Sequence, residues 1–422
     1  MISLKIMESR SCMDKMQESH GISTKCKLLN LAAADLIVRT AYQMGKTPLL
    51  PLLAIGLGAN STFLGFIVSA STLTGMLLKP LFGMLSDRWG RWIWFFIGTL
   101  LFSIVPFFYF FIESAQQLLI LRLIHGTATA IYGPVTIAWV IEQRQEQNST
   151  DNNCAERLGW FGMARSAGYM LGPVLSAALL TVFEPEIVFA AIGLISSSAF
   201  LPVLLLKDCS IPVRAYKSWR LQFKNAMKTG FQTTELWLAG LLEFVVNIGL
   251  YSAKAFLPLY ALQQNIPVLW VGLFFTIQEL IHLAARPFGG RLSDRTGHLP
   301  VTAAGMMLAA LSLGLMPIAT STQPLLLLAI GIGLAQALIF PSIVALYAQK
   351  IDSSHIGAGT GIIGSFKNAG KIAGPIIGGL IIHWHDFTWM LWSMAGLLAT
   401  WGLVLLLNPF SRKTFFIQWQ SR

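Results

Sequence analysis

The chain has 422 residues and a formal net charge of +11, yet only 12% of its residues are charged and 55% are hydrophobic. Soluble domains carry about a quarter charged residues, so this chain has too little polar surface for water to cover, and lipid must be its solvent. Two soluble α/β domains are thereby excluded. A nucleic-acid-binding protein is excluded as well, because the basic residues lie in short loops between apolar runs.

Twelve stretches of the chain are long and apolar enough to cross a bilayer. A spanning helix needs roughly 20 mainly apolar residues, and a helix satisfies its own backbone hydrogen bonds in lipid. We therefore expect an all-α membrane protein with twelve transmembrane helices. They cover residues 28–55, 62–84, 93–112, 116–142, 157–182, 186–206, 235–261, 268–289, 299–318, 324–349, 358–383 and 387–408.

The loops between these stretches alternate in charge, and this indicates their orientation. Loops after the odd-numbered spans contain no Lys or Arg and carry Glu113, Glu184, Glu186 and Asp386. The other loops are basic, and residues 207–234 form the longest of them. Cytoplasmic loops are enriched in Lys and Arg. We therefore expect both termini and residues 207–234 to lie in the cytoplasm.

The same pattern divides the chain into five parts. We expect a cytoplasmic N-terminal tail at residues 1–27, a six-helix bundle at 28–206, a cytoplasmic linker at 207–234, a second six-helix bundle at 235–408 and a cytoplasmic C-terminal tail at 409–422. The tail at the start is polar and mixed in charge, unlike a secretory signal. The first apolar stretch is therefore expected to remain as a spanning helix.

The two expected bundles repeat one pattern. Residues whose numbers differ by 207 match over a long stretch, as Pro51 matches Pro258 and Pro80 matches Pro287. Copies in the same orientation indicate a pseudo-twofold axis along the membrane normal. Most charges inside the spans have no charged counterpart at this difference of 207. We expect the chemistry to reside in these unmatched charges, namely Asp35, Arg122, Glu243, Glu279 and His282.

A glycine-rich charged motif follows the second span and recurs after the eighth. Gly83, Asp87, Arg88, Gly90 and Arg91 form the first copy. The motif resembles the signature loop between helices 2 and 3 of the major facilitator superfamily, whose cluster latches the two halves in the outward-facing state. The resemblance implies the same role for the second copy, which contains Gly290, Asp294, Arg295 and Gly297.

Two further motifs are similar to those of the drug:proton antiporter branch of this superfamily. Arg122 and Gly126 in the fourth span resemble an Arg-x-x-x-Gly motif of proton-coupled members. A Gly-Pro motif in the fifth span has a second copy in the eleventh, so it also fits close helix packing. A proline inside a spanning helix bends it. The two copies are Gly168, Gly172 and Pro173, and Gly370, Gly374 and Pro375.

Ionisable residues inside the spans need a partner or a purpose, because each costs about 2.5–3.5 kcal/mol to insert. Asp35 and Arg39 lie one helical turn apart and could simply neutralise each other. The functional alternative is that Asp35 and Glu243 carry protons. In that case, movement of Arg122 toward or away from a carboxylate would couple proton release to substrate exchange.

Helices 1, 4, 7 and 10 line the central cavity of the resembled fold, and charged residues on them are candidate substrate contacts. Glu279 and His282 share one face of the eighth span, either as a packed pair or as a substrate or proton site. We expect Arg165 and Lys367 to extend toward lipid phosphates instead. The candidate cavity residues are Arg39, Lys46, His125, Lys254, Glu279, His282 and Lys371.

The sequence contains no phosphate-binding loop, dinucleotide-binding glycine pattern or zinc-ligand spacing. We therefore expect no enzyme activity, cofactor or metal, and an ion gradient as the driving force. The leading hypothesis is a monomeric, proton-coupled exporter of a small amphiphilic drug or secreted metabolite in a bacterial inner membrane, working by alternating access. The alternative is a proton-coupled importer of a small anionic metabolite or metal chelate. A third hypothesis, a transporter-like sensor, would usually bring an added soluble output domain.

Overall fold

The structure, a computed structural model, describes residues 28–142, 154–206, 234–348 and 356–407. Within these ranges the chain is helical and contains no strand, so the all-α prediction is confirmed for them. The predicted tails and the linker up to residue 233 lie outside the described residues.

The helices of the first half follow the predicted spans, except that the first span is interrupted at residues 45–48 and the sixth at residues 198–199. They are a helix over residues 28–44, α2 (Leu49–Gly56), α3 (Ser61–Trp89), α4 (Arg91–Phe108) with the 3-10 turn η1 (Tyr109–Phe111), α5 (Ala115–Glu142), α6 (Cys154–Leu179), α7 (Pro185–Ser197) and α8 (Phe200–Leu204).

The second half has the same order of long helices. They are α10 (Thr234–Gln263), α11 (Val268–Thr296), α12 (His298–Leu315) with the 3-10 turn η3 (Met316–Ile318), α13 (Thr322–Ala348), α14 (Ile356–Trp384) and α15 (Phe387–Leu407).

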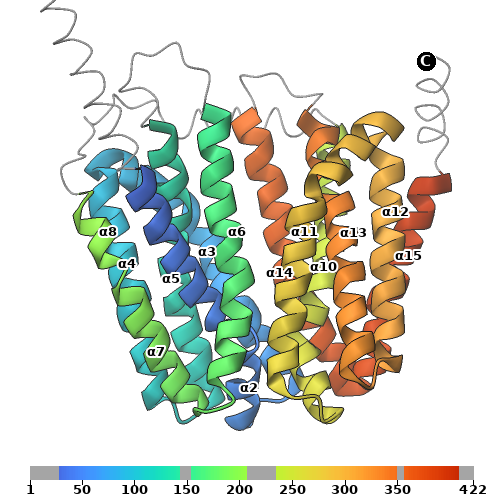
Figure 1. The fold of residues 1–422 in the computed structure, drawn as a ribbon, viewed down its shortest axis with the longest axis horizontal. Coiled ribbons are helices and arrows are strands. Elements are labelled where there is room, and N and C mark those ends of the chain that lie inside the picture. Colours follow the sequence, from blue (N-terminus) through green and yellow to red (C-terminus); the bar gives the residue numbers. More distant parts are fainter. Residues whose placement is uncertain (1–27, 143–153, 207–233, 349–355, 408–422) are drawn as a thin grey trace, which may run out of the picture.

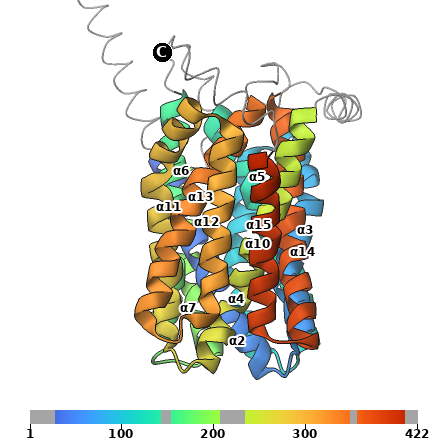
Figure 2. The same ribbon diagram turned by 90° about the vertical axis from the view of Figure 1, so that its right-hand side faces the viewer.

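Among the described residues, nine helices are long and apolar enough to cross a membrane, as expected of a multi-pass membrane protein. The broken first helix, α6 and α14 do not meet this criterion, because the first is interrupted and the other two carry many glycines and internal basic residues. These helices nevertheless run beside the others in Figures 1 and 2. Twelve crossings therefore stay a prediction.

The first predicted span is interrupted, whereas its counterpart α10 is continuous. Residues 28–44 and α2 are separated by a turn at residues 45–48. Pro48 lies at the end of this turn, where it lacks the backbone N–H and disfavours a helical residue before it. The prediction of one unbroken helix over residues 28–55 is therefore wrong.

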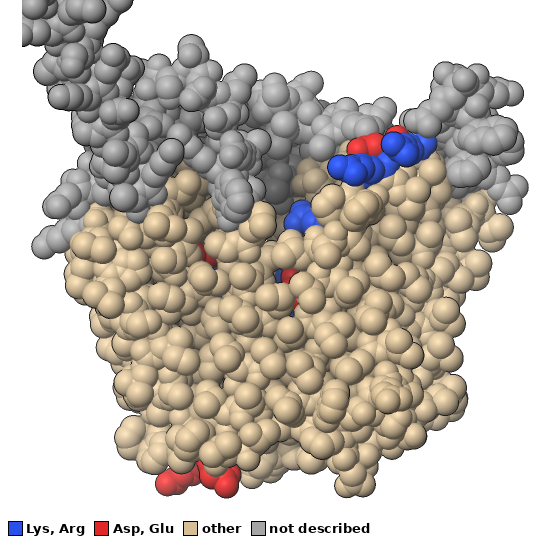
Figure 3. Space-filling model, viewed as in Figure 1, with Lys and Arg blue, Asp and Glu red and all other residues tan. Residues whose placement is uncertain are grey.

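The two halves lie side by side, with the first half to the left in Figure 1. All described residues that adjoin undescribed segments lie at one end of the bundle, which is also the end of Arg88 and Arg291; we call this the basic end. The connections at the opposite, acidic end carry Glu113, Glu184 and Asp386, and Figure 3 shows acidic atoms there.

The halves touch mainly along two helix pairs, toward the acidic end. In the α3–α14 pair, Ser69 donates a hydrogen bond to the carbonyl of Ile372 (2.8 Å). In the α6–α11 pair, Thr276 donates to the carbonyl of Met170 (2.8 Å). Beyond Ser69 toward the basic end, the same two helices α3 and α14 separate and line a cavity. The halves are therefore closed at the acidic end and apart at the basic end.

Candidate functional site

A cavity of about 560 Å³ lies between the halves on the basic-end side of their contacts. Its walls come from residues 28–46, α3, α5 and α6 of the first half and from α10 and α14 of the second. Figure 3 shows the surface hollowed between the halves toward this end. Small-molecule pockets usually measure about 300–1,000 Å³, so the cavity has room for a small organic molecule.

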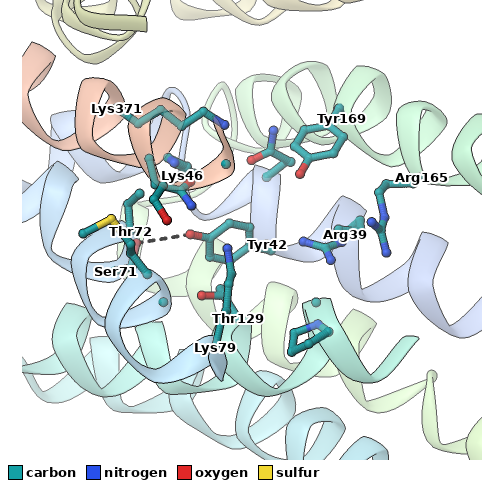
Figure 4. A pocket seen from close by; sticks show the side chains of 18 of the residues that line it. Arg39, Tyr42, Lys46, Ser71, Thr72, Lys79, Thr129, Arg165, Tyr169 and Lys371 are labelled. Atoms are coloured by element: carbon teal, nitrogen blue, oxygen red, sulfur yellow. Dashed lines mark hydrogen bonds between the residues drawn. The ribbon is translucent and has the colours of Figure 1, made fainter. Parts of the chain in front are cut away.

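The charged side chains that line the cavity are all basic, and no Asp or Glu belongs to its described lining. Five of them are labelled in Figure 4, which shows them gathered around Tyr42. Positive charges gathered in a cleft with low-dielectric walls attract anions. The six are Arg39, Lys46, Lys79, Arg165, Lys254 and Lys371.

Three of these basic side chains surround one tyrosine. The ammonium nitrogens of Lys46, Lys254 and Lys371 lie 5.5, 5.9 and 4.7 Å from the centre of the Tyr251 ring. The contacts are cation–π interactions by distance. Among the described residues, none of these three lysines forms an ion pair with a carboxylate. The lysines come from both halves, so the cluster spans the interface between them.

Asp35 is fully buried behind this basic wall. Arg165 donates to it twice, with Nε 3.0 Å from Oδ2 and Nη2 3.3 Å from Oδ1, and Arg39 Nε lies 3.5 Å from Oδ1. Arg165 also donates to Thr136 (3.1 Å). The prediction that Arg165 extends toward lipid phosphates is wrong, because the buried carboxylate needs a charged partner. Both arginines that hold Asp35 line the cavity.

Glu243 on α10 is held in a comparable way. Lys367 Nζ lies 3.4 Å from its Oε2, and Asn247 donates to the same oxygen at 2.9 Å. The Lys367 ammonium also lies 4.3 Å from the centre of the Phe340 ring. The lipid-phosphate prediction is therefore wrong for Lys367 too. Glu243 and Lys367 do not belong to the described cavity lining.

The two carboxylate–base pairs occupy matching positions in the two halves. Asp35 and Glu243 differ by 208 in residue number, and so do Lys46 and Lys254. Helix contacts show the same correspondence. Gly172 contacts Thr40 and Met44 in the first half, and Gly374 contacts Ile248 and Ser252 in the second, so the contacted residues also differ by 208. The prediction that Asp35 and Glu243 lack charged counterparts is wrong, because the difference of 207 holds only after the break at residues 45–48.

Arg122 lies in a separate buried network. It donates to Ser71 Oγ (2.6 Å) and to Tyr109 OH (3.5 Å), and Tyr109 OH shares a hydrogen bond with His125 Nδ1 (3.2 Å). Tyr42 OH joins Ser71 at 3.1 Å, drawn as a dashed line in Figure 4. Arg122 and His125 are outside the cavity lining. Within the described ranges no ion pair joins Arg122 to a carboxylate.

Glu279 and His282 form a pair on α11. The Nδ1 atom of His282 lies 3.5 Å from Oε1 of Glu279, and its ring packs edge-on against Phe340. Neither residue lines the described cavity. Their role in substrate or proton binding stays a prediction.

Sequence reasoning missed several residues that line the cavity, among them Lys79 and Tyr169. Lys79 lies inside the predicted span 62–84 next to Pro80, so a charge within an apolar run was the signal that could have identified it. Tyr169 lies between the glycines of the Gly-Pro motif on α6 and faces Arg39 and Lys371 across the cavity in Figure 4. No feature of the sequence alone distinguishes this tyrosine from one that faces lipid.

Comparison with a family model decides the family. The model described as Major Facilitator Superfamily matches residues 36–281 and, a second time, residues 236–421. The chain belongs to the Major Facilitator Superfamily. Members of this superfamily are transporters that bind small molecules and usually work as monomers.

Several bacterial members are similar to this chain over most of its length. The uncharacterized MFS-type transporter YuxJ of Bacillus subtilis is 27% identical over 75% of this chain and 80% of its own. Multidrug resistance protein 1 of the same organism is 24% identical over 79% and 84%. The quinolone resistance protein NorA of Staphylococcus aureus is 22% identical over 80% and 85%.

A solved structure of the superfamily has the same fold. The nucleoside transporter NupG superposes with a TM-score of 0.73 over 90% of this chain and 98% of its own, at 15% sequence identity. A mutant form of NupG gives a TM-score of 0.76 at 16% identity. At such low identity the likeness concerns the fold alone.

The superfamily latch motif is mostly helical here. Helix α3 continues to Trp89, and only Gly90, with φ of 90°, breaks it before α4. Gly297, with φ of 98°, separates α11 from α12 in the same way. These conformations favour glycine. The predicted loops are therefore single-glycine turns, and Gly83 and Gly290 lie within helices.

Both latch copies make one matching contact inside their own half. Arg91 donates to Ser86, and His298 shares a hydrogen bond with Ser293 (2.7 Å). Arg91 also pairs with Asp87 one turn earlier. The predicted action of the motif between the halves stays a prediction.

The Gly-Pro motifs allow close helix packing. A Cβ added at Gly168 would lie 2.9 Å from Arg39 Cβ, and one added at Gly374 would lie 2.6 Å from the carbonyl oxygen of Ile248. The same glycines place α6 against residues 28–44 and α14 against α10. They thereby bring Arg165 to Asp35 and Lys367 to Glu243.

Proposed function

We propose that this protein is a proton-coupled exporter that moves small amphiphilic compounds out of a bacterial cell by alternating access. One observation carries the proposal: the cavity lies between two halves that touch at one end and separate at the other. Rocking of the halves about such a cavity would expose it to each side of the membrane in turn.

The names of two relatives support the outward direction. The basic end, toward which the halves separate, is expected to be cytoplasmic by the distribution of Lys and Arg; an exporter would load its substrate there, and an importer would release its substrate there. Relatives that cover about four fifths of the chain are named as a multidrug resistance protein and a quinolone resistance protein. An amphiphile would contact the tyrosines and the apolar side chains of the cavity lining.

Asp35 is the best-supported proton-coupling residue. Both of its arginine partners line the cavity, so a substrate that contacts Arg39 or Arg165 changes the charge around a carboxylate that it does not touch. Glu243 has Lys367 as its corresponding partner. Arg122 would act in another conformation of the cycle, because here it binds Ser71 and Tyr109.

Proteoliposomes with an acidic lumen and a lumenal pH dye test this function, with a quinolone as the probe. We expect the quinolone to enter while the lumen loses protons, since exchange carries the two in opposite directions. Asp35→Asn should abolish the dependence of uptake on the pH gradient, whereas Arg291→Gln, which removes one exposed charge of the opposite sign, should leave it intact. Quinolone and protons moving in the same direction would overturn export by antiport.

The all-basic cavity favours a second candidate, proton-coupled import of a small anion. A bound anion would compete with Asp35 for Arg39 and Arg165. Asp35 would then bind a proton together with the substrate, and both would cross in the same direction. The same vesicle measurement separates the two candidates by the sign of proton movement.

A further inference from the structure

Resting on the proposed transport function, we propose that the cavity binds organic anions with at least two negatively charged acid groups, carboxylate or phosphate, held by Lys46, Lys254 and Lys371. The three ammonium groups lie within 6 Å of the centre of the Tyr251 ring. They come from the turn after residues 28–44, from α10 and from α14. An anion bound there would connect the two halves.

Within the described part of the chain, the lysine cluster has no carboxylate in ion-pair contact. Three like charges near one ring repel one another, and the repulsion is stronger near apolar walls than in water. Glu279 on α11 acts on Lys254 and Lys371 only at longer range, because its near partner is His282 at 3.5 Å. Asp35 and Glu243 are held by other bases. A bound anion is the partner that these lysines lack within the described residues.

The two arginines on the other side of the cavity, unlike the three lysines, contact a carboxylate. Arg39 and Arg165 are also basic, but both contact Asp35. Their charge is therefore partly neutralised, and the lysine cluster is the more strongly positive region. Figure 4 shows Lys46 and Lys371 close together on one side of the cavity, with Tyr42 between them and the arginines.

The shape and the charge together define the ligand class. Tyrosine faces offer stacking to an aromatic or flat apolar body, while the lysines offer up to three point charges to acid groups at its edge. The cavity of about 560 Å³ accommodates such a molecule. A permanent cation without an acid group finds no carboxylate in the described lining.

A charge series on one ring tests this inference in the purified full chain in detergent. The probes are benzoate, benzene-1,3-dicarboxylate, benzene-1,3,5-tricarboxylate and benzyltrimethylammonium, and binding is measured by titration calorimetry. We expect affinity to rise about tenfold with each added carboxylate and to fall with added salt. 1,3-Phenylene bisphosphate should bind at least as tightly as the dicarboxylate, because it presents two acid groups with more charge.

Matched variants locate the site. Lys46→Gln, Lys254→Gln and Lys371→Gln should each weaken binding of the tricarboxylate about tenfold, while Arg291→Gln, which removes one exposed charge outside the cavity, should not change it. Lys371→Arg, which keeps the charge, should retain most of the affinity. Where a Gln variant fails to fold, the charge series and salt dependence of the unaltered protein still test the inference.

Equal affinities along the series, or tighter binding of benzyltrimethylammonium than of the tricarboxylate, would overturn the anion site. Gln variants that bind the tricarboxylate as tightly as the unaltered chain would overturn its placement at the lysines. The proposed function fails separately: it falls if the anions bind but no probe moves in proteoliposomes. It stands without the anion site if only the cation is exported.

Discussion

Asp35 shows why the placement of one carboxylate matters to this protein. Its side chain is completely buried, and its two partners, Arg39 and Arg165, come from different helices. A buried charge is tolerated only when it is paired and hydrogen-bonded. Asp35 therefore holds α6 against residues 28–44, and it also sets the charge of the neighbouring cavity wall.

Asp35→Asn should lower the stability of the folded protein as well as its proton coupling. The substitution leaves Arg39 and Arg165 without their carboxylate, and removing one member of a buried pair costs about 3–5 kcal/mol. Unfolding of the purified protein by denaturing detergent measures the free energy of unfolding. Asp87→Asn is the matched control, because Asp87 is 55% exposed in its pair with Arg91 and exposed pairs contribute about 0–1 kcal/mol. Equal losses for the two variants would contradict a structural role for Asp35.

Sequence reasoning found most of the charged residues of the site and the Asp35–Arg39 pair within one helix, but not the partners that come from other helices. Lys46, Lys254 and Lys371 were visible because a charge inside an apolar run is rare. The pairing of Asp35 with Arg165 was not visible, because it joins residues 130 positions apart and depends on how two helices pack. The same reason explains the wrong predictions for Arg165 and Lys367, since snorkelling is the usual behaviour of a lone basic residue near a helix end.

At the scale of elements, glycines decide which helices come together. Gly172 on α6 would place an added Cβ 2.5 Å from Gln43 Cβ, and Gly374 on α14 would place one 2.6 Å from the carbonyl of Ile248. Small residues let helix backbones approach closely in membranes. The Gly-Pro motifs therefore have a packing role in both halves, whatever the direction of transport.

Gly374→Ala should destabilise the second half. Its methyl group would meet the backbone of α10, which has no flexible end to move aside, and such overpacking costs about 1–3 kcal/mol. Gly396→Ala on α15 is the control, because nothing lies within 4 Å of a Cβ there and alanine favours the helix by up to about 1 kcal/mol. The thermal midpoints of the two variants in detergent provide the measurement. A Gly374→Ala midpoint at or above that of the unaltered chain would show that α10 and α14 can separate without loss.

Helix limits were predictable to within a few residues, and the exceptions have local causes. Apolar length identified each span, since lipid thickness fixes that length. The break at residues 45–48 could not be predicted from Gly45 and Pro48, because α6 is continuous although it contains Gly172 and Pro173 side by side. The latch motif was expected as a loop, but a single glycine with positive φ is enough to turn the chain between α3 and α4.

At the scale of the whole molecule, close contacts between the halves form the closed end, and two of them involve matching glycines. Gly65 on α3 lies against the carbonyl of Pro375 on α14, and Gly272 on α11 would place a Cβ 2.7 Å from the carbonyl of Pro173 on α6. The two sites are equivalent, because Gly65 and Gly272 differ by 207. Closure at the acidic end therefore requires a glycine from each half to meet the proline of the other half's Gly-Pro motif.

Gly65→Ala should consequently shift the protein toward a conformation that is closed at the basic end. The added methyl group clashes only while α3 and α14 touch at the acidic end, so the substitution raises the free energy of this conformation by about 1–3 kcal/mol and leaves the opposite conformation unaffected. A difference of about 1.4 kcal/mol changes the ratio of two conformations about tenfold. Gly272→Ala should act in the same direction through α6 and α11.

A cysteine at position 368 reports the shift, because Asn368 lines the cavity on α14. In a chain whose four native cysteines are replaced by serine, Asn368→Cys should react with a membrane-impermeant thiol reagent added to inside-out vesicles. Adding Gly65→Ala should slow this reaction by up to about tenfold, whereas adding Gly396→Ala should not. Labelling that slows equally in both variants would mean that the glycine affects general stability. Labelling that stays fast in both would mean that the contact of Gly65 with Pro375 does not govern which end of the molecule is closed.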